Sequence, residues 1–101
     1  MEPIVTKLAG VSFGDRQQNI KLFGNRDINS YSLEREPSNP YDPNAVLVSI
    51  GTYHLGYLPT TLSKVIGPLM DAGKKFKAEF HSLNRSPYHD TVGLTVKIIE
   101  I

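Results

Sequence analysis

Cysteine is absent from the sequence, and no apolar run approaches the length of a membrane span. The lack of cysteine excludes a disulfide framework, thiolate zinc sites and a cysteine nucleophile. A membrane-spanning helix needs about 20 consecutive apolar residues. Residues 1–7 lack the basic-then-apolar order of a secretory signal. We therefore expect a cytoplasmic location and no contact with a membrane.

An excess of positive charge is also missing, because 11 basic and 10 acidic residues give a formal net charge of +1. Any affinity for nucleic acid must then come from a local patch rather than from the field of the whole protein. A chain of 101 residues can bury one core and not a second. We therefore expect one domain over residues 1–101.

Signatures of catalysis and of metal binding are lacking as well. The chain has neither a Gly-x-Ser-x-Gly elbow nor a glycine-rich phosphate loop, and its three histidines do not sit at a recognised ligand spacing. Asp42 and Glu36 are a conceivable carboxylate pair for magnesium, which leaves a metal-dependent phosphodiesterase as an alternative. Charge balance against Arg35, or packing at the strand end, is the more ordinary role for Glu36. We expect no enzyme, no catalytic residues, no cofactor and no metal site.

Apolar and polar residues alternate over six short segments, which is the pattern of half-buried β-strands. The expected strands cover residues 4–11, 31–36, 45–50, 53–58, 75–81 and 94–99. In the third of these, Val46 and Val48 alternate with Leu47 and Ser49. Such alternation predicts one face toward the core and one toward solvent.

Two segments carry helix signals, and the first is a candidate short helix over residues 15–23. In the second, apolar residues recur at helical spacing and predict a stripe that faces the core. They are Leu62, Val65, Ile66, Leu69 and Met70. Thr60 or Thr61 is expected to cap this helix, and Gly73 should end it. Gly67-Pro68 lies inside it and should kink or split it.

Six short strands with one clear helix late in the chain favour a mainly β fold with helices. A small curled antiparallel sheet or barrel, plugged at one end by the helix, would bury both the strand and the helix patterns. A doubly wound parallel sheet is disfavoured, because helices do not alternate regularly with the strands.

Residues 35–45 read Arg-Glu-Pro-Ser-Asn-Pro-Tyr-Asp-Pro-Asn-Ala, with three prolines. Each proline lacks a backbone N–H and restricts the residue before it, so the segment should be a stiff loop. The loop holds Tyr41 beside Asp42, a ring that can stack on a base next to a carboxylate that can accept a hydrogen bond from a hydroxyl. Rigidity lowers the ordering cost of binding. The alternative is a plain proline-rich turn in which Asn and Asp bond their own backbone.

Four segments carry motifs that fit together. The segment 35–46 is the longest, 8–13 reads Leu-Ala-Gly-Val-Ser-Phe, and 55–59 reads Leu-Gly-Tyr-Leu-Pro. The segment 69–73 follows at the end of the expected helix. In this order they resemble the HIRAN domain family over most of the chain. The resemblance implies a single HIRAN-like domain of mainly β structure with helices (α+β). Its expected form is a small OB-like six-stranded antiparallel β-barrel with one or two short helices.

In members of this family that are fused to a helicase, the domain binds single-stranded DNA and captures a free 3′-hydroxyl end. The resemblance implies that Phe13 and Tyr41 stack on the terminal bases and that Asp42 bonds the 3′-hydroxyl. Those members carry a histidine and a lysine near the positions where this chain has Tyr57 and Thr60. Tyr57 still supplies a ring and a hydroxyl. Loss of the lysine removes a phosphate contact, which lowers the salt dependence of binding.

Lys75 and Lys77 lie in the one locally basic region of the sequence, where aromatic residues interleave with them. They are candidates for a rim that follows the phosphates of a strand, and the loop 84–90 is expected to place Tyr88 at the mouth of the binding groove. Alternatively, the lysines cover a solvated strand face and block edge pairing.

Two functions are therefore predicted. The first is a non-enzymatic module that binds single-stranded DNA at a free 3′-hydroxyl end, or another nucleic acid, in DNA repair, replication or restriction. Its candidate residues are Phe13, Tyr41, Asp42, Tyr57, Lys75, Lys77 and Tyr88. The second is a protein-interaction module that docks a DNA-processing enzyme without binding DNA itself, since a barrel with an exposed edge strand can bind a peptide.

Overall fold

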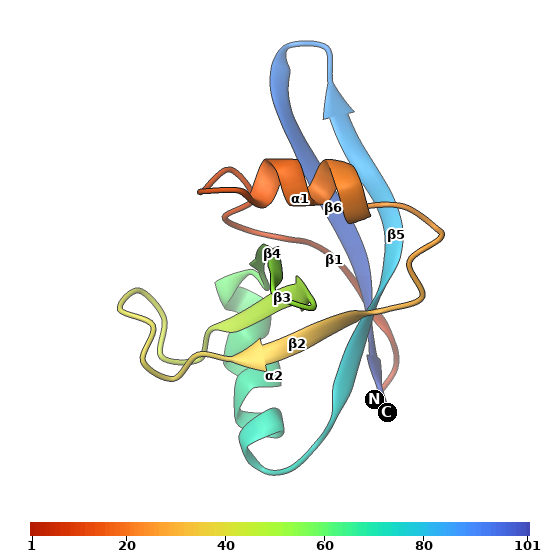
Figure 1. The fold of residues 1–101 in the computed structure, drawn as a ribbon. Helices are drawn as coiled ribbons and strands as arrows, with labels where there is room; N and C mark the ends of the chain where they lie inside the picture. Colours follow the sequence, from red (N-terminus) through yellow and green to blue (C-terminus); the bar gives the residue numbers. More distant parts are fainter.

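The computed structural model describes residues 1–101, which form six strands and two helices (Figure 1). In chain order the elements are β1 Ile4–Lys7, α1 Arg16–Phe23, β2 Tyr31–Arg35, β3 Val46–Ile50, β4 Tyr53–Tyr57, α2 Thr60–Asp71, β5 Phe76–Ser86 and β6 His89–Glu100. Neither helix has the length and apolar content that crossing a membrane requires.

The six strands form one antiparallel sheet in the order β1-β6-β5-β2-β3-β4, and the sheet curls into a half-barrel. One pair of residues joins its two edges. The Ala9 amide donates to the Tyr57 carbonyl at 2.7 Å, and the Tyr57 amide donates back at 2.9 Å. Just before this, the Leu8 amide donates to Leu94 of β6 at 2.9 Å. The chain therefore switches from β6 to β4 within two residues, which closes one side of an OB-like barrel.

The core lies between the curled sheet and the two helices. α1 packs against β4 and β6, and α2 packs against β3. Each helix contributes one isoleucine with no exposed surface, Ile20 from α1 and Ile66 from α2. Full burial of such a side chain stabilises the fold by roughly 1.5–3 kcal/mol. At the end of α1 the buried Tyr31 hydroxyl donates to the Phe23 carbonyl at 2.6 Å. Burial raises the pKa of Tyr31 to about 12, which keeps this donor protonated.

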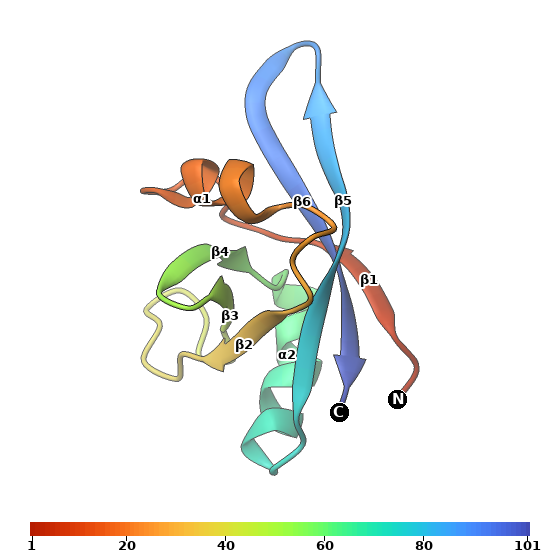
Figure 2. The ribbon, with the colours of Figure 1, turned by 45° about the vertical axis from the view of Figure 1, so that its right-hand side comes forward.

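The two ends of the chain lie side by side. β1 runs antiparallel to β6, with Ile4 opposite Ile98. The Met1 amino group also lies 3.0 Å from Oε1 of Glu100. In Figures 1 and 2 both termini sit on the side of the molecule away from the loop that joins β2 to β3.

β3 differs from its expected one-sided pattern. Leu47 and Ser49 have 1% and 0% of their surface exposed, and Val46 and Val48 on the opposite face have none exposed. β3 is an interior strand between β2 and β4, and both of its faces are covered. A strand buried on both faces loses the contrast between apolar and polar positions on which the prediction relied.

β5 and β6 are longer than expected and meet in a tight hairpin. Ser86 pairs with His89, so that only Pro87 and Tyr88 form the turn (Figure 1). The loop expected over residues 84–90 is wrong, because most of it is strand. The outer part of this hairpin has no buried face, and its polar side chains therefore show no alternation.

α2 is one continuous helix through Gly67-Pro68, so it is not split into two short helices. Lys64, whose carbonyl loses its helical partner at Pro68, is exposed, so that carbonyl can bond to water. Neither threonine caps the start, where Pro59 occupies the cap position. The end is as predicted: Gly73 has a φ of +99°, and its amide donates to Met70 at 3.0 Å.

The exposed surface of α2 also departs from the predicted stripe. Val65 is 46% exposed, although it was expected to face the core. The residues of α2 that are buried are Ser63, Ile66 and Gly67. Ser63 is polar and Gly67 has no side chain. The side of the helix that carries them therefore does not pack against the apolar core.

Barrel closure should be sensitive to Gly56 in β4. A methyl group at this position would lie 2.8 Å from the Ala9 carbonyl oxygen, which is too close for a stable contact. We expect Gly56→Ala to lower the free energy of unfolding by about 1–3 kcal/mol, the usual cost of overpacking. Urea denaturation measures this, with Thr52→Ala in the exposed turn before β4 as the control. An unchanged urea midpoint for Gly56→Ala would show that the closure adds nothing to stability.

Candidate nucleic-acid interface

A groove of about 830 Å³ opens beside the point where the barrel closes. Three segments line it: the turn between β1 and α1, the loop 36–45, and the junction of β4 with α2. Phe13, Tyr41, Asp42 and Tyr57 all contribute to its wall. We call it the aromatic groove. It brings together four of the seven residues that the sequence selected.

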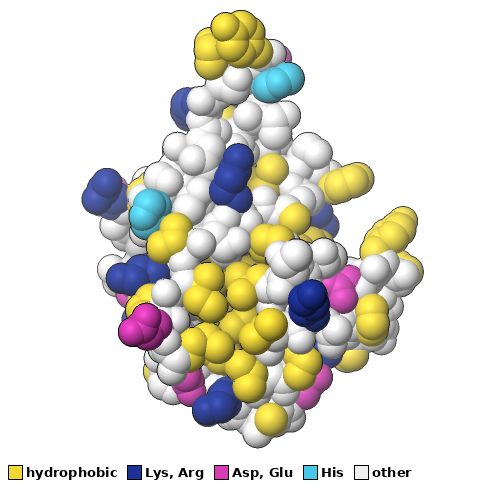
Figure 3. Space-filling view, turned by 180° about the vertical axis from the view of Figure 1, so that it is seen from behind, with side chains coloured by type: hydrophobic (Ala, Val, Ile, Leu, Met, Phe, Trp, Pro, Cys, Tyr) yellow, Lys and Arg dark blue, Asp and Glu magenta, His cyan; other side chains and the backbone are white.

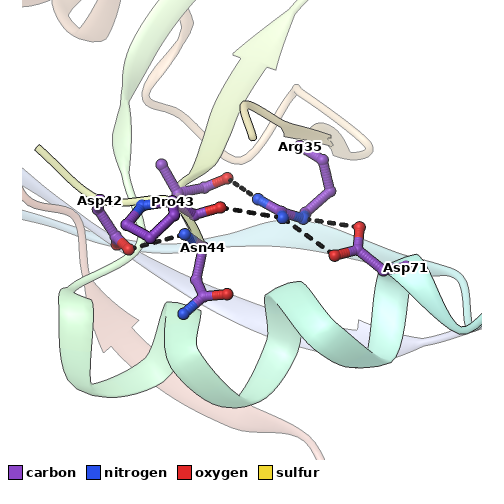
Figure 4. A network of polar contacts seen from close by, with 6 residues as sticks. Arg35, Asp42, Pro43, Asn44 and Asp71 are labelled. Carbon is purple, nitrogen blue, oxygen red and sulfur yellow. Dashed lines mark hydrogen bonds and ion pairs between the residues drawn. The ribbon is translucent and has the colours of Figure 1, made fainter. Parts of the chain in front are cut away.

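Arg35 ties the loop 36–45 to α2 (Figure 4). Its guanidinium donates to the carbonyl oxygens of Ala45 at 2.8 Å and Pro43 at 3.1 Å. The same group makes a two-pronged ion pair with the Asp71 carboxylate at 2.9 and 3.0 Å. This contact holds the pKa of Asp71 below its usual value and raises that of Arg35. Arg35 thus pairs with Asp71, and the prediction that Glu36 balances the charge of Arg35 is wrong.

Asn39 organises the tip of the loop. Its Oδ1 accepts hydrogen bonds from the amides of Tyr41 at 2.9 Å and Asp42 at 3.1 Å. Its Nδ2 donates to Oε1 of Glu36 at 3.1 Å. The self-bonded turn weighed as an alternative is therefore present. It does not compete with a binding role, because the same turn leaves Tyr41 94% exposed at the edge of the aromatic groove.

One face of α2 holds this loop at three points. Oγ of the buried Ser63 donates to Oδ2 of Asp42 at 2.7 Å. One turn later Gly67 lies so close that a methyl group there would sit 2.7 Å from the Asn44 carbonyl oxygen. Asp71 follows after another turn, paired with Arg35. The spacing of four residues places these contacts on one line along the helix.

Asp42 keeps accepting capacity despite its protein contacts. One carboxylate oxygen accepts from Ser63, and the other accepts from the Asn44 amide at 2.8 Å. A carboxylate has about four lone-pair sites, so each oxygen can take a second donor. Asp42 is partly exposed and faces the aromatic groove. Its two protein bonds hold it in one orientation, which suits recognition of a hydroxyl group.

Tyr57 presents its ring rather than its hydroxyl to the aromatic groove. The hydroxyl donates to Oε1 of Glu36 at 2.6 Å. Burial, and then this hydrogen bond, raise the pKa of Tyr57, while the charge of Arg16 opposes the rise. The sequence-based prediction that Tyr57 would offer a free hydroxyl to a ligand therefore does not match this geometry. The ring alone is available.

Glu36 and Asp42, the pair considered for magnesium, accept hydrogen bonds from separate partners. Glu36 bonds Tyr57 and Asn39, and Asp42 bonds Ser63 and Asn44. Across the chain, no three His, Asp or Glu side chains gather closely enough to hold a metal ion.

Lys75, Lys77 and Tyr88 do not line the aromatic groove. The amino group of Lys77 lies 3.3 Å from the carboxylate of Glu79. At Lys77, β5 is paired with β2 on one side and with β6 on the other, so Lys77 does not protect a sheet edge. Tyr88 is 87% exposed at the tip of the β5–β6 hairpin. Seen from behind, the basic side chains are scattered and form no continuous patch (Figure 3). A binding role for these three residues stays a prediction.

Arg16 lines the aromatic groove and was missed by the sequence analysis. Its guanidinium carbon lies 5.0 Å from the ring centre of Tyr57 and 5.7 Å from that of Phe13. No local pattern marks this residue, because Tyr57 reaches it only through the pairing of Ala9 with β4.

A small OB-like barrel with an open groove, aromatic rings and a rigid loop defines a binding domain of the kind that holds nucleic acid strands. Residues 3–98 match the model of the HIRAN domain, and the chain belongs to the HIRAN domain family. The resemblance and the fold predicted from the sequence are confirmed. HIRAN domains bind DNA and are not catalytic, so the chain carries a nucleic-acid-binding module.

Two solved structures share the fold. The HIRAN domain of human HLTF matches with a TM-score of 0.72 and 17% identity, over 97% of this chain and 74% of that one. A protein from Lactobacillus plantarum matches with a TM-score of 0.69 and 18% identity, over 98% and 97%. A Fanconi-associated nuclease 1 homolog from Oryza sativa subsp. japonica is 46% identical over 46 residues. These residues are 42% of this chain and only 5% of the nuclease.

The pair of Arg35 with Asp71 should make stability depend on acid pH. Because Arg35 lowers the pKa of Asp71 from 3.8, the stabilisation is complete above that value and is lost as the pH falls through the lowered pKa. Asp71→Asn should therefore reduce the Tm at neutral pH and make no difference at the acid end. Circular dichroism melts over this pH range measure the gap. The control is Asp90→Asn, an exposed carboxylate without an ion pair. A gap that persists in strong acid would contradict the ion-pair origin.

Proposed function

We propose that this protein binds single-stranded DNA in the aromatic groove, recognises a free 3′-hydroxyl end, and catalyses no reaction itself. The observation that supports this most directly is that Phe13, Tyr41 and Asp42 line one open groove. Phe13 is distant in sequence from the adjacent pair Tyr41 and Asp42, and Phe13 and Tyr41 are the exposed rings that base stacking requires. Family membership supports nucleic acid as the class of ligand.

The two rings supply sequence-independent affinity. Phe13 is 66% exposed and Tyr41 is 94% exposed, so both rings are accessible to a base. Stacking of a base on such a ring is worth roughly 1–3 kcal/mol. Because the loop is already bonded to α2 and to itself, little ordering cost opposes binding.

Asp42 accounts for the preference for a strand that ends in a 3′-hydroxyl group. Its fixed carboxylate accepts a hydrogen bond from a 3′-hydroxyl, whereas a 3′-phosphate brings negative charge against it. A strand that continues past this point also lacks the hydroxyl. The function therefore fits the ends of broken, nicked or newly made strands. The similarity to a protein named as a Fanconi-associated nuclease homolog favours a DNA-repair setting.

A second candidate is a protein-interaction module that docks a DNA-processing enzyme. The observation that favours it is the apolar area on the face of the molecule seen in Figure 3. The two functions are separable, because groove substitutions would leave this second surface intact.

Removal of the Tyr41 ring should weaken binding of a short oligonucleotide that ends in a 3′-hydroxyl. A stacking contribution of about 1–3 kcal/mol corresponds to about a 5- to 150-fold rise in Kd for Tyr41→Ala. Fluorescence anisotropy with a labelled oligonucleotide measures Kd. Tyr53→Ala is the control, because Tyr53 is also an exposed tyrosine and lies outside the aromatic groove. If the two substitutions raise Kd equally, the aromatic groove is not the binding site.

End selectivity should depend on Asp42 and on its support from Ser63. The wild-type protein should bind a 3′-hydroxyl oligonucleotide at least about tenfold better than the 3′-phosphate form, since one lost charge-assisted hydrogen bond is worth about 1.5–3 kcal/mol. Asp42→Asn should abolish most of this ratio, and Ser63→Ala should reduce it by loosening the carboxylate. Asp90→Asn should leave it unchanged. If the wild-type protein binds both ends equally, the recognition of a 3′-hydroxyl is wrong.

A further inference from the structure

A second hollow of about 260 Å³ adjoins the aromatic groove, and we call it the polar hollow. Phe13 and Arg16 line both, so the groove and the hollow share a wall. The other residues of the polar hollow are Gly14, Asp15, Asn19, Thr52 and His54. Phe13 is its one apolar side chain, and the opposite charges of Asp15 and Arg16 offset each other. A neutral, polar ligand therefore suits the polar hollow better than a phosphate group does.

Asn19 is the buried polar side chain of this hollow, with 8% of its surface exposed. Its Nδ2 donates to the His54 carbonyl at 2.9 Å, and this is the one hydrogen bond of the side chain within the protein. A carbonyl oxygen only accepts, so the atom that faces the backbone of His54 has to be the amide nitrogen. The amide oxygen of Asn19 is therefore the atom that is left without a partner.

The amide oxygen of Asn19 opens onto the polar hollow. No side-chain oxygen or nitrogen in the structure is both enclosed and without a partner. Since Oδ1 lacks a partner, it has to reach space outside the protein, and the polar hollow is the space that Asn19 lines. The bond to His54 holds this oxygen in one direction. It favours a ligand that brings an N–H or O–H donor, because a polar atom that a ligand covers without pairing costs free energy.

A strand bound in the aromatic groove can supply such a donor. Because Phe13 lines both spaces, a strand can place one base against this ring in the groove and the neighbouring base in the polar hollow. Cytosine and adenine present an amino group beside a ring nitrogen that accepts hydrogen bonds. The amino group would donate to Oδ1 of Asn19, and the hydroxyl of Thr52 on the exposed rim can donate to the ring nitrogen. Thymine carries a carbonyl oxygen in place of the amino group, so two acceptors would face each other.

We propose that the polar hollow is a base-binding subsite that selects cytosine or adenine, with the amide oxygen of Asn19 accepting a hydrogen bond from the amino group of the base. This inference rests on the proposed binding of single strands, and it adds a preference for the sequence next to the 3′ end. The aromatic groove supplies stacking, which every base can make. The polar hollow makes the protein favour some strand ends over others.

The test varies one base at a time in a thymidine oligonucleotide that ends in a 3′-hydroxyl. A single cytosine is moved stepwise from the 3′ end, and fluorescence anisotropy gives Kd for each position. At one position cytosine should lower Kd by about 2- to 12-fold, which corresponds to one neutral hydrogen bond. Pyrimidin-2-one, which is cytosine without its amino group, should lose this gain at the same position. Equal Kd values for the two bases at every position would overturn the inference.

Substitution of Asn19 should remove the same preference. Asn19→Leu keeps about the same side-chain volume without the amide, so the cytosine and pyrimidin-2-one oligonucleotides should then bind with equal Kd. Gln18→Leu is the matched control, because Gln18 is an exposed amide of α1 that lines neither space. If loss of the bond to His54 prevents Asn19→Leu from folding, Thr52→Leu alters the hollow from its exposed rim and should reduce the preference. A preference for cytosine that persists in these variants would contradict the role of the polar hollow.

The wild-type protein separates this inference from the proposed function. If it binds every sequence equally and still depends on Tyr41, the base preference is wrong and the binding of single strands stands. If it binds no oligonucleotide at all, the proposed function is wrong, and the inference falls with it.

Discussion

Arg35 makes four hydrogen bonds, two to backbone carbonyls of the loop and two to the carboxylate of Asp71. Without them the loop 36–45 would keep its bonds to Tyr57 and Ser63 but would lose its attachment to the end of α2. With them, and with Ser63 and Gly67 on the same line of α2, the loop becomes one wall of a groove. α2 acts as a rigid support, and the contacts of Ser63 and Gly67 with the loop fix the positions of Tyr41 and Asp42.

Each of the two acidic side chains of the groove accepts two hydrogen bonds from the protein. Glu36 receives the Tyr57 hydroxyl and the Asn39 amide, and Asp42 receives Ser63 and the backbone of Asn44. Both carboxylates thus shape the wall before any ligand arrives. Their negative charge repels phosphates, so the two carboxylates themselves add no long-range attraction for a nucleic acid. This weak long-range attraction agrees with the near-neutral charge of the chain.

The sequence predicted what depends on local chemistry. The proline spacing implied a stiff loop that displays Tyr41 and Asp42, and Gly73 marked the end of a helix. It failed where a residue's role is set by distant pairing. Ser63 and Gly67 in α2 hold a loop some twenty residues upstream, and an apolar stripe in the same helix concealed them. Arg16 acts in the groove only because Ala9 pairs with Tyr57. Such long-range contacts leave no periodic trace in one sequence.

The adjacent ends of the chain have a consequence for architecture. Because β1 and β6 are antiparallel neighbours, a polypeptide entering at one terminus would leave beside its point of entry. The domain could therefore be inserted into a surface turn of a larger enzyme without distorting the host protein or the domain itself. The loop that joins β2 to β3 would then lie on the side away from the junction, as Figure 1 shows for the loop and the two termini. A fold built in this way can travel between host proteins while its ligand site stays intact.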